Sequence, residues 1–142
     1  MRPLHAKPSL AAAKALLESA QLPTADLTEQ HCEHFLYAGA EGAPTGLVGL
    51  ELFGDVALLR SLVVSPDARA AGMGTTLVQH AEARARAHGV RTVYLLTTTA
   101  EGFFDRRGYA KVARELAPAA IKATREFAGI CPASSAFMSK QL

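Results

Sequence analysis

The chain has 142 residues, of which 49% are hydrophobic and 20% charged, and its formal net charge is +2. This composition is typical of a globular domain, and the absence of a long basic run argues against nucleic acid as the main partner. The most apolar stretches, such as Leu47–Leu52 and Val56–Val64, are too short to span a membrane. We therefore expect one domain over residues 1–142. Two cysteines, Cys32 and Cys131, give no disulfide framework, so the cytoplasm is the simplest location.

The N-terminal part of the chain is expected to contain one helix followed by antiparallel strands. Ser9 suits a helix N-cap, and apolar residues recur after it at helical spacing. Glu41–Thr45 holds turn residues between two strand patterns, and Gly54-Asp55 is a glycine-first pair that favours a type II′ hairpin. In chain order, we expect a strand at Arg2–His5, a helix at Ser9–Ala20, a helical turn at Thr28–His34, and strands at Phe35–Ala40 and Gly46–Phe53.

The second half of the chain alternates strands and helices. Val56–Val64 is apolar and long enough for one strand, and the helix that Thr75 opens has an apolar face formed by Leu77, Val78, Ala81 and Ala85. Glu82, Arg84 and Arg86 fall off that face. The remaining expected elements are a strand at Thr92–Thr97, a helix at Ala100–Arg107, a strand at Tyr109–Arg114, a helix at Pro118–Ala128 and a strand at Ser135–Ser139. This order predicts a mixed α/β fold in which antiparallel hairpins lead into a parallel crossover.

A glycine-containing loop connects the Val56–Val64 strand to the following helix, and its sequence is Arg69-Ala70-Ala71-Gly72-Met73-Gly74. A helix N-terminus offers free N–H groups and a positive dipole end, and glycines let a phosphate approach the backbone. No lysine follows Gly74 as in a P-loop, and no third glycine completes the dinucleotide-binding pattern. The loop therefore predicts an anion site of another type.

This loop resembles the acetyl-CoA pyrophosphate loop of the GNAT superfamily of N-acetyltransferases, and the resemblance extends from about Phe35 to Tyr109. Leu62-Val63-Val64-Ser65-Pro66 and Phe103-Phe104-Asp105-Arg106-Arg107-Gly108-Tyr109 are similar to the flanking segments of that family. The resemblance implies a GNAT fold and acetyl-CoA as co-substrate. It places Leu62 and Val64 at the pantetheine arm, and it places around the pyrophosphate Arg69, Ala70, Gly72, Met73, Gly74 and Thr75.

One aromatic position departs from the family. Phe104 stands where many GNAT enzymes have a tyrosine that protonates the departing thiolate, and we count it among the cofactor-binding residues. A phenylalanine carries no proton, so water, a threonine hydroxyl or the product ammonium would supply it. Glu51 and Glu101 are candidates for the general base. Each also has a structural interpretation, because Glu51 suits a solvated strand position and Glu101 suits a helix N-terminus.

Arg60 interrupts an apolar strand, on the face that strict alternation gives to Leu58 and Leu62. A buried arginine is rare unless it is paired. Two interpretations remain open: an internal salt bridge with Glu51 or Asp55, or a two-pronged contact with an acceptor carboxylate.

Two runs, 54–62 and 94–104, look closest to the arsenic-resistance N-acetyltransferases and to the acetyltransferase domain of N-acetylglutamate synthase. These branches imply a small amino-acid-like acceptor with an anionic end, held by Arg60, Thr97 and Thr98. Alternatives are glutamate itself as acceptor, a non-catalytic module that binds acetyl-CoA or an amino acid, and a purely structural α/β domain. Arsenite capture by Cys32 and Cys131 and the oligomeric state, a homodimer included, stay open.

The run His31-Cys32-Glu33-His34 contains residues that can bind metals. On a short helix its side chains point around the axis, and no second ligand pair follows at a zinc spacing. We therefore expect no metal site in this chain.

Overall fold

The computed structural model describes residues 4–22, 24–66, 72–130 and 135–142. The strands are β1 (Leu4–Ala6), β2 (Phe35–Ala40), β3 (Ala43–Phe53), β4 (Val56–Val64), β5 (Thr92–Thr97), β6 (Ala110–Lys111) and β7 (Ala136–Gln141). The helices are α1 (Leu10–Ser19), α2 (Glu29–Cys32), α3 (Met73–Ala87), α4 (Glu101–Asp105) and α5 (Ala119–Lys122), with a 3₁₀ turn, η2 (Arg114–Leu116), and a π-helical turn, η3 (Glu126–Ile130).

The strands form one sheet in the order β1-β2-β3-β4-β5-β7-β6. Strands β1 to β4 are antiparallel neighbours, β4 and β5 are parallel, and β7 is antiparallel to both β5 and β6. Helix α3 is the crossover between the two parallel strands. The predicted mixed α/β fold, with antiparallel hairpins before a parallel crossover, is therefore confirmed.

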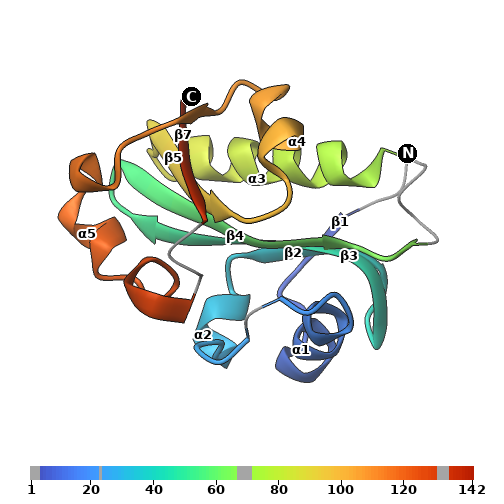
Figure 1. Cartoon of the computed structure of the whole chain (residues 1–142). Coiled ribbons are helices and arrows are strands. Elements are labelled where there is room, and N and C mark those ends of the chain that lie inside the picture. Colours follow the sequence, from blue (N-terminus) through green and yellow to red (C-terminus); the bar gives the residue numbers. More distant parts are fainter. Residues whose placement is uncertain (1–3, 23, 67–71, 131–134) are drawn as a thin grey trace.

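Helices cover both faces of the sheet (Figure 1). On one face α3 and α4 pack on alternate strand residues, which include Leu36, Val48, Leu59 and Leu95. On the other face α1 and α2 cover Phe35 and Leu47, and α5 covers Leu58 and Phe137. This division follows from the two-residue period of strand side chains, which sends neighbouring residues to opposite faces.

Several local predictions are confirmed. The Ser9 Oγ accepts a hydrogen bond from the Ala12 N–H at 3.1 Å and caps α1. Strands β2 and β5 have the predicted bounds, and Gly54 has a positive φ of 70° in the turn before β4. The predicted turn at Glu41–Thr45 was too long, because Ala40 pairs with Ala43 and a register shift at Ala38/Gly39 lets β3 begin early.

The predicted continuous helix at Pro118–Ala128 was wrong, since α5 ends at Lys122 and η3 begins at Glu126. The Thr124 hydroxyl donates to the Ile121 carbonyl at 2.7 Å and accepts from the Phe127 N–H at 3.3 Å. Such local side-chain bonds compete with the helical backbone pattern. This break determines where Glu126 lies relative to the sheet.

The prediction that Glu82 falls off the buried face of α3 was also wrong, because Glu82 is buried. Its carboxylate accepts a hydrogen bond from the Tyr109 hydroxyl at 2.9 Å and lies 3.1 Å from the Lys140 Nζ. Burial is the main cause that raises the pKa of Tyr109, and the Glu82 charge adds to it. We call Glu82, Lys140 and Tyr109 the Glu82 cluster.

Among the helices of the described ranges, none is long and apolar enough to cross a membrane.

Candidate active site

The two parallel strands separate part-way along their length. Strand β4 pairs with β5 only from Val56 to Leu58, opposite Thr92 to Tyr94. Beyond that point β5 keeps its pairing with β7 as far as Ala136, while β4 follows β3. The ends of β4 and β5 therefore diverge and leave a gap in the middle of the sheet.

A β-bulge in β4 accompanies this divergence. Arg60 pairs with Gly49 and Val63 pairs with Leu47, so Ser61 and Leu62 together oppose one residue of β3. Ser61 has a φ of 59°, a left-handed conformation that is uncommon for residues other than glycine. Bulges bend the strand that carries them and often lie beside functional sites. The bulge also shifts the alternation of side chains along β4. Strict alternation predicted that Leu62 shares the face of Leu58 and Arg60, but Leu62 packs on the α3 face.

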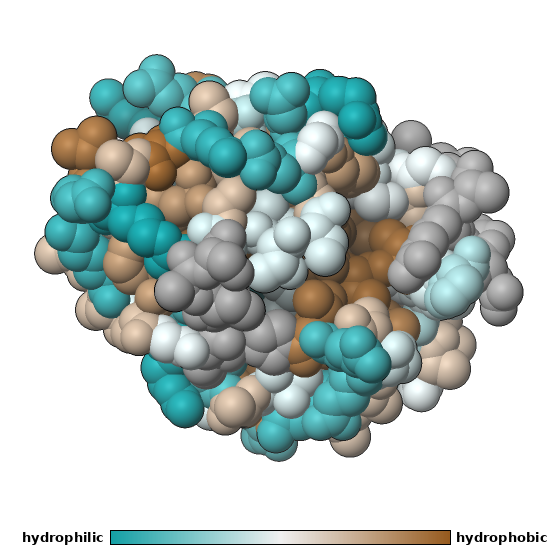
Figure 2. Space-filling model, viewed as in Figure 1, coloured by the Kyte–Doolittle hydropathy of each residue, from teal (hydrophilic) through white to brown (hydrophobic). Residues whose placement is uncertain are grey.

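The gap opens a cavity of about 610 Å³. Its two sides are formed by β4 residues 59–62 and by residues 95–100, and Phe104 closes part of it. Figure 2 shows the corresponding face of the molecule, where the surface is hollowed and apolar side chains line the hollow. The polar groups on the lining are those of Gln21, Arg60, Ser61, Thr97, Thr98, Thr99, Glu126 and Ser135. A cavity with apolar walls and a few polar groups is typical of a small-molecule site.

The N-terminus of α3 begins at the predicted glycine loop. Gly72 caps the helix with a φ of 70°, and no side chain of the described residues caps its first turn. A Cβ at Gly72 would meet no atom within 4 Å, whereas a Cβ at Gly74 would lie 3.3 Å from the Phe103 ring. This geometry fits a pyrophosphate, because an anion can approach the N–H groups of the first helical turn closely.

Thr75 is held by an arginine from the end of α4. The Arg107 guanidinium donates to the Thr75 Oγ1 through Nε, at 3.1 Å, and through Nη2. It also donates to the Phe103 carbonyl at 2.7 Å and lies 3.7 Å from the centroid of the Phe103 ring. These contacts fix the aromatic segment of α4 beside the N-terminus of α3.

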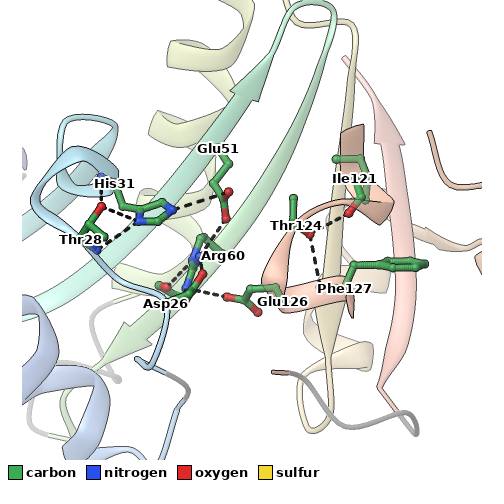
Figure 3. A network of polar contacts seen from close by, with 10 residues as sticks. Asp26, Thr28, His31, Glu51, Arg60, Ile121, Thr124, Glu126 and Phe127 are labelled. Carbon is green, nitrogen blue, oxygen red and sulfur yellow. Dashed lines mark hydrogen bonds and ion pairs between the residues drawn. The ribbon is translucent and has the colours of Figure 1, made fainter. Parts of the chain in front are cut away.

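On the lining of the cavity Arg60 is surrounded by three carboxylates (Figure 3). Asp26 accepts from both terminal nitrogens, at 2.5 and 2.8 Å, while Glu51 accepts from Nη1 at 2.8 Å and Glu126 lies 3.0 Å from Nη2. The Nε–H donates to the Ser61 Oγ at 3.1 Å. These contacts occupy all five N–H donors of the guanidinium. We call Arg60, Asp26, Glu51 and Glu126 the Arg60 cluster.

Charge pairing within the Arg60 cluster changes the acidity of its members. Burial alone raises the pKa of the Asp26 carboxyl, but the hydrogen bonds and charge of Arg60 outweigh burial and hold that pKa below its usual value. Burial lowers the pKa of Arg60, and the surrounding carboxylates more than reverse this effect. Asp26 and Arg60 are therefore both ionised at neutral pH.

The other residues predicted for the site fall into two groups. Leu62, Thr97, Thr98 and Phe104 line the cavity, while Gly72, Met73, Gly74 and Thr75 form the start of α3. Met73 is buried in the core, so its backbone alone faces the loop. Val64 lies beyond the lining, next to Gly74. Arg69 and Ala70 fall outside the described residues, as does Cys131, while Cys32 is buried.

The two candidate bases do not line the cavity. Glu51 lies behind Arg60 and reaches the cavity only through it. Glu101 is about half exposed and forms an ion pair with Lys111 at 3.3 Å. Of the partners that the sequence offered to Arg60, the structure pairs it with Glu51 and gives it two others, Asp26 and Glu126.

Sequence reasoning missed Asp26, Glu126 and Ser135 as members of this region. Asp26 and Glu126 are 34 and 66 positions from Arg60 along the chain, so no local pattern connects them. The available signal was the charge of Arg60 itself, because a buried guanidinium requires carboxylate partners.

One group of side chains has the atoms needed to bind a metal ion within 4.8 Å of one another: Asp26, His31 and Glu51. Arg60 already takes both oxygens of Asp26 and one of Glu51. The His31 Nδ1 accepts from the Thr28 N–H at 3.1 Å, so a neutral His31 carries its proton on Nε2, 3.8 Å from Glu51. These internal contacts compete with a metal, and the expectation of no metal site stays a prediction.

The family model for the acetyltransferase (GNAT) family matches residues 6–109. The chain belongs to the GNAT family. The match covers more than half of the sequence and includes the glycine loop, both diverging strands and Phe104. The resemblance inferred from the loop is thereby confirmed, together with the GNAT fold and, at the level of the family, the acyltransferase class.

Curated relatives of this GNAT domain include acetyltransferases of amino acids. The chain is 35% identical over 97 residues to the amino-acid acetyltransferase of Ectopseudomonas mendocina, which covers 67% of this chain and 22% of that protein. It is 34% identical over 93 residues to an N-acetyltransferase of Chlorobaculum tepidum, covering 65% of this chain and 59% of that protein. The chain thus spans about a fifth of the first relative and over half of the second.

Solved structures share the fold over the whole chain. N-acetylglutamate synthase from Neisseria gonorrhoeae, solved with coenzyme A and N-acetyl-glutamate, superposes with a TM-score of 0.81 at 22% identity, covering 100% of this chain and 35% of that one. A GNAT acetyltransferase from Staphylococcus aureus superposes with a TM-score of 0.75 at 15% identity, covering 100% and 99%. These likenesses confirm the architecture.

Proposed function

We propose that this GNAT domain transfers an acetyl group from acetyl-CoA to the amino group of a small amino-acid-like acceptor. The observation that carries the proposal is the cavity between the diverging ends of β4 and β5, whose lining includes Arg60 and Phe104. The N-terminus of α3 lies next to this region, because Gly74 lies beside Phe103. A thioester and an amine can meet in such a cavity because apolar walls and polar groups suit different parts of the two substrates.

The cofactor half of the site is supported by the start of α3 and by the apolar walls. Gly72, Gly74 and Thr75 would hold the pyrophosphate, with Arg69 and Ala70 from the loop, while Leu62 and Val64 would flank the pantetheine arm. When bound, acetyl-CoA supplies the acetyl thioester. Phe104 closes the cavity without a proton to give, so the proposal includes no tyrosine acid. N-acetylglutamate synthase of N. gonorrhoeae, solved with coenzyme A, has the same fold, which adds support.

The acceptor half is supported by the names of the relatives and by the polar lining. One relative described above is an amino-acid acetyltransferase, and Arg60, Thr97 and Thr98 line the cavity. Since all five Arg60 donors are engaged, an acceptor carboxylate could reach this guanidinium only by replacing one of its partners, and Glu126 is the partner that lines the cavity. Glu51 and Glu101 stay candidate bases, and each would act through water.

The narrower possibilities within this proposal are resistance to arsenic compounds or toxic amino-acid analogues, and acetylation of glutamate. A screen with acetyl-CoA that measures free thiol separates them, with amino acids, their phosphinic and arsenical analogues, and polyamines as acceptors. Binding of acetyl-CoA without thiol release for any acceptor would favour a non-catalytic binding module. The cytoplasmic location and the single-domain organisation stay part of the same proposal.

The cofactor half is tested by Gly72→Val. A valine at a φ of 70° should place a branched side chain against the N–H groups of α3 and reduce acetyl-CoA affinity at least about 100-fold. Isothermal calorimetry measures this loss. Gly89→Val is the matched control, because Gly89 has a φ of 85°, lies at the far end of α3 and has equally open surroundings.

The two variants share the same backbone strain, so equal losses of thermal stability are expected. Gly89→Val should bind acetyl-CoA as the unmodified protein does. A folded Gly72→Val protein with unchanged affinity for acetyl-CoA would contradict the assignment of the loop.

A further inference from the structure

A second cavity lies beside the start of α3, between α3, the C-terminal end of α4 and β7. Its volume is about 470 Å³, and no described residue lines both this cavity and the one between β4 and β5. Helices α3 and α4 lie on the same face of the sheet (Figure 1). Four residues of α3 line the second cavity, from Thr75 to Glu82, together with Arg106, Arg107 and Lys140. The α3 positions are three or four residues apart, so they form one face of the helix.

The lining of the second cavity carries more positive than negative charge. Glu82 is the only carboxylate among its described residues, and Lys140 pairs with it at 3.1 Å. Arg106 and Arg107 are the other two charged residues, and neither forms an ion pair with a described residue. The electrostatic potential in this cavity therefore favours an anion.

The contact between Arg107 and Thr75 leaves protons without an acceptor. A hydroxyl has two lone pairs and one proton, and a guanidinium has five N–H groups. Arg107 donates to the Thr75 Oγ1 through both Nε and Nη2, so the two lone pairs are used and the hydroxyl proton is left to donate. A third N–H of Arg107 donates to the Phe103 carbonyl, which leaves one N–H on each terminal nitrogen. Within the described residues, none of these three protons has an acceptor.

The Arg107 guanidinium is held in place before any ligand binds. Its three hydrogen bonds fix it between α3 and α4, and it lies 3.7 Å from the centroid of the Phe103 ring. A donor group that is already ordered loses little side-chain entropy on binding. Arg106 follows the last residue of α4, so a second guanidinium lines the same cavity. Two guanidinium groups and a hydroxyl proton match a phosphate, which has several acceptor oxygens and a negative charge.

Acetyl-CoA has three phosphates, two in the pyrophosphate and a third on the 3′ oxygen of the adenosine ribose. Thr75 belongs to the first turn of α3 and also lines the second cavity, so the cavity continues directly from the place assigned to the pyrophosphate. We propose that the second cavity binds the 3′-phosphate of acetyl-CoA through Arg106, Arg107 and the Thr75 hydroxyl. This inference rests on the proposed function, because it starts from the pyrophosphate at the N-terminus of α3.

The second cavity thus selects the phosphorylated cofactor. The test compares acetyl-CoA with acetyl-dephospho-CoA, which lacks only the 3′-phosphate. Isothermal calorimetry on the full chain should give a dissociation constant at least about tenfold higher for the dephosphorylated compound. The ratio of the two constants isolates the 3′-phosphate, since both compounds share the thioester, the pantetheine arm and the pyrophosphate.

Two substitutions should lower this ratio. Arg107→Gln removes a fixed guanidinium and should reduce the ratio to about threefold or less. Arg106→Gln removes an exposed one and should reduce the ratio by a factor of about 2 to 5. Arg86→Gln is the matched control, because it removes the same charge from an exposed position in the last turn of α3, outside the lining. Arg86 is 11 positions from Thr75, about 16 Å along the helix axis, so the ratio should not change.

Equal affinity of the unmodified protein for the two compounds would overturn the proposal. A ratio that keeps its full value in both arginine variants would also overturn it, because the 3′-phosphate would then be bound elsewhere. If Arg107→Gln does not fold, an unchanged ratio in Arg106→Gln is sufficient to overturn it. Failure of the proposed function has a different signature, which is that neither compound binds or that no acceptor leads to thiol release.

Discussion

Two buried groups of charged side chains lie on opposite faces of the sheet, and they differ in the number of carboxylates that meet the cation. In the Glu82 cluster one carboxylate meets one ammonium and one hydroxyl, from α3, β7 and the segment after α4. In the Arg60 cluster one guanidinium meets three carboxylates, from the segment before α2, from β3 and from η3. Only the Arg60 cluster lies on the lining of the large cavity.

This difference distinguishes a structural role from a functional one. A buried carboxylate with one cation and one hydroxyl needs nothing further, so the Glu82 cluster accounts for the packing of α3 against β7. In the Arg60 cluster, by contrast, Arg60 and Glu126 lie on the wall of a cavity, where a ligand can reach them. The Arg60 cluster is therefore the region where substitutions should affect both stability and acceptor binding.

The largest expected effect comes from Arg60→Gln. This change removes the guanidinium that Asp26, Glu51 and Glu126 share, and it should lower the free energy of unfolding by about 3–5 kcal/mol. Urea denaturation followed by circular dichroism measures the loss. A loss below about 1 kcal/mol would show that the cluster does not stabilise the fold.

Arg60→Lys sharpens the same comparison, because it keeps the charge but offers three donors in place of five. We expect a smaller loss of stability and unchanged affinity for acetyl-CoA. If this variant is stable and its acceptor KM rises only for acceptors that carry a carboxylate, then Arg60 contacts that carboxylate directly and Glu126 is displaced on binding.

In the Glu82 cluster, Lys140→Met should have a smaller effect. It removes the cation and leaves the Tyr109 hydroxyl on Glu82. Lys140 is about a quarter exposed, so solvent already weakens the pair, and we expect a loss of about 1–2 kcal/mol. The acceptor KM should not change. A rise in acceptor KM equal to that of a variant in the Arg60 cluster would remove the functional distinction between the two regions.

Local sequence patterns predicted much of the fold but little of the Arg60 cluster. Residues 35–40 and 92–97 formed strands within the predicted bounds, and Ser9 capped its helix, because these features depend on neighbours a few positions away. The bulge at Ser61 and the shifted face of Leu62 depend on the pairing of β4 with β3, which no local pattern contains.

In the candidate site, too, local sequence patterns predicted only what depends on neighbouring residues. The loop at Gly72 was recognisable because its function depends on contiguous backbone. The partners of Arg60 were not, since Asp26 lies in an irregular segment and Glu126 in a break between two short helical segments. The three carboxylates around Arg60 could be found together only once tertiary contacts were known.

The smallest expected effect is a change of stability with pH that only the Arg60 cluster should produce. The pKa of Asp26 is lowered in the folded protein, so the unfolded chain binds more protons when the pH falls below about 4, the usual value for aspartate. The contribution of Asp26 to the free energy of unfolding is therefore complete above that pH and is lost as the pH falls toward the folded-state pKa.

Asp26→Asn should flatten the decline of the unfolding free energy between pH 5 and pH 2. Urea titration at each pH measures this slope. Asp55→Asn, an exposed residue outside the cluster, should keep the original slope. An Asp26→Asn protein with the same slope as the unmodified chain would show that Arg60 does not stabilise this carboxylate.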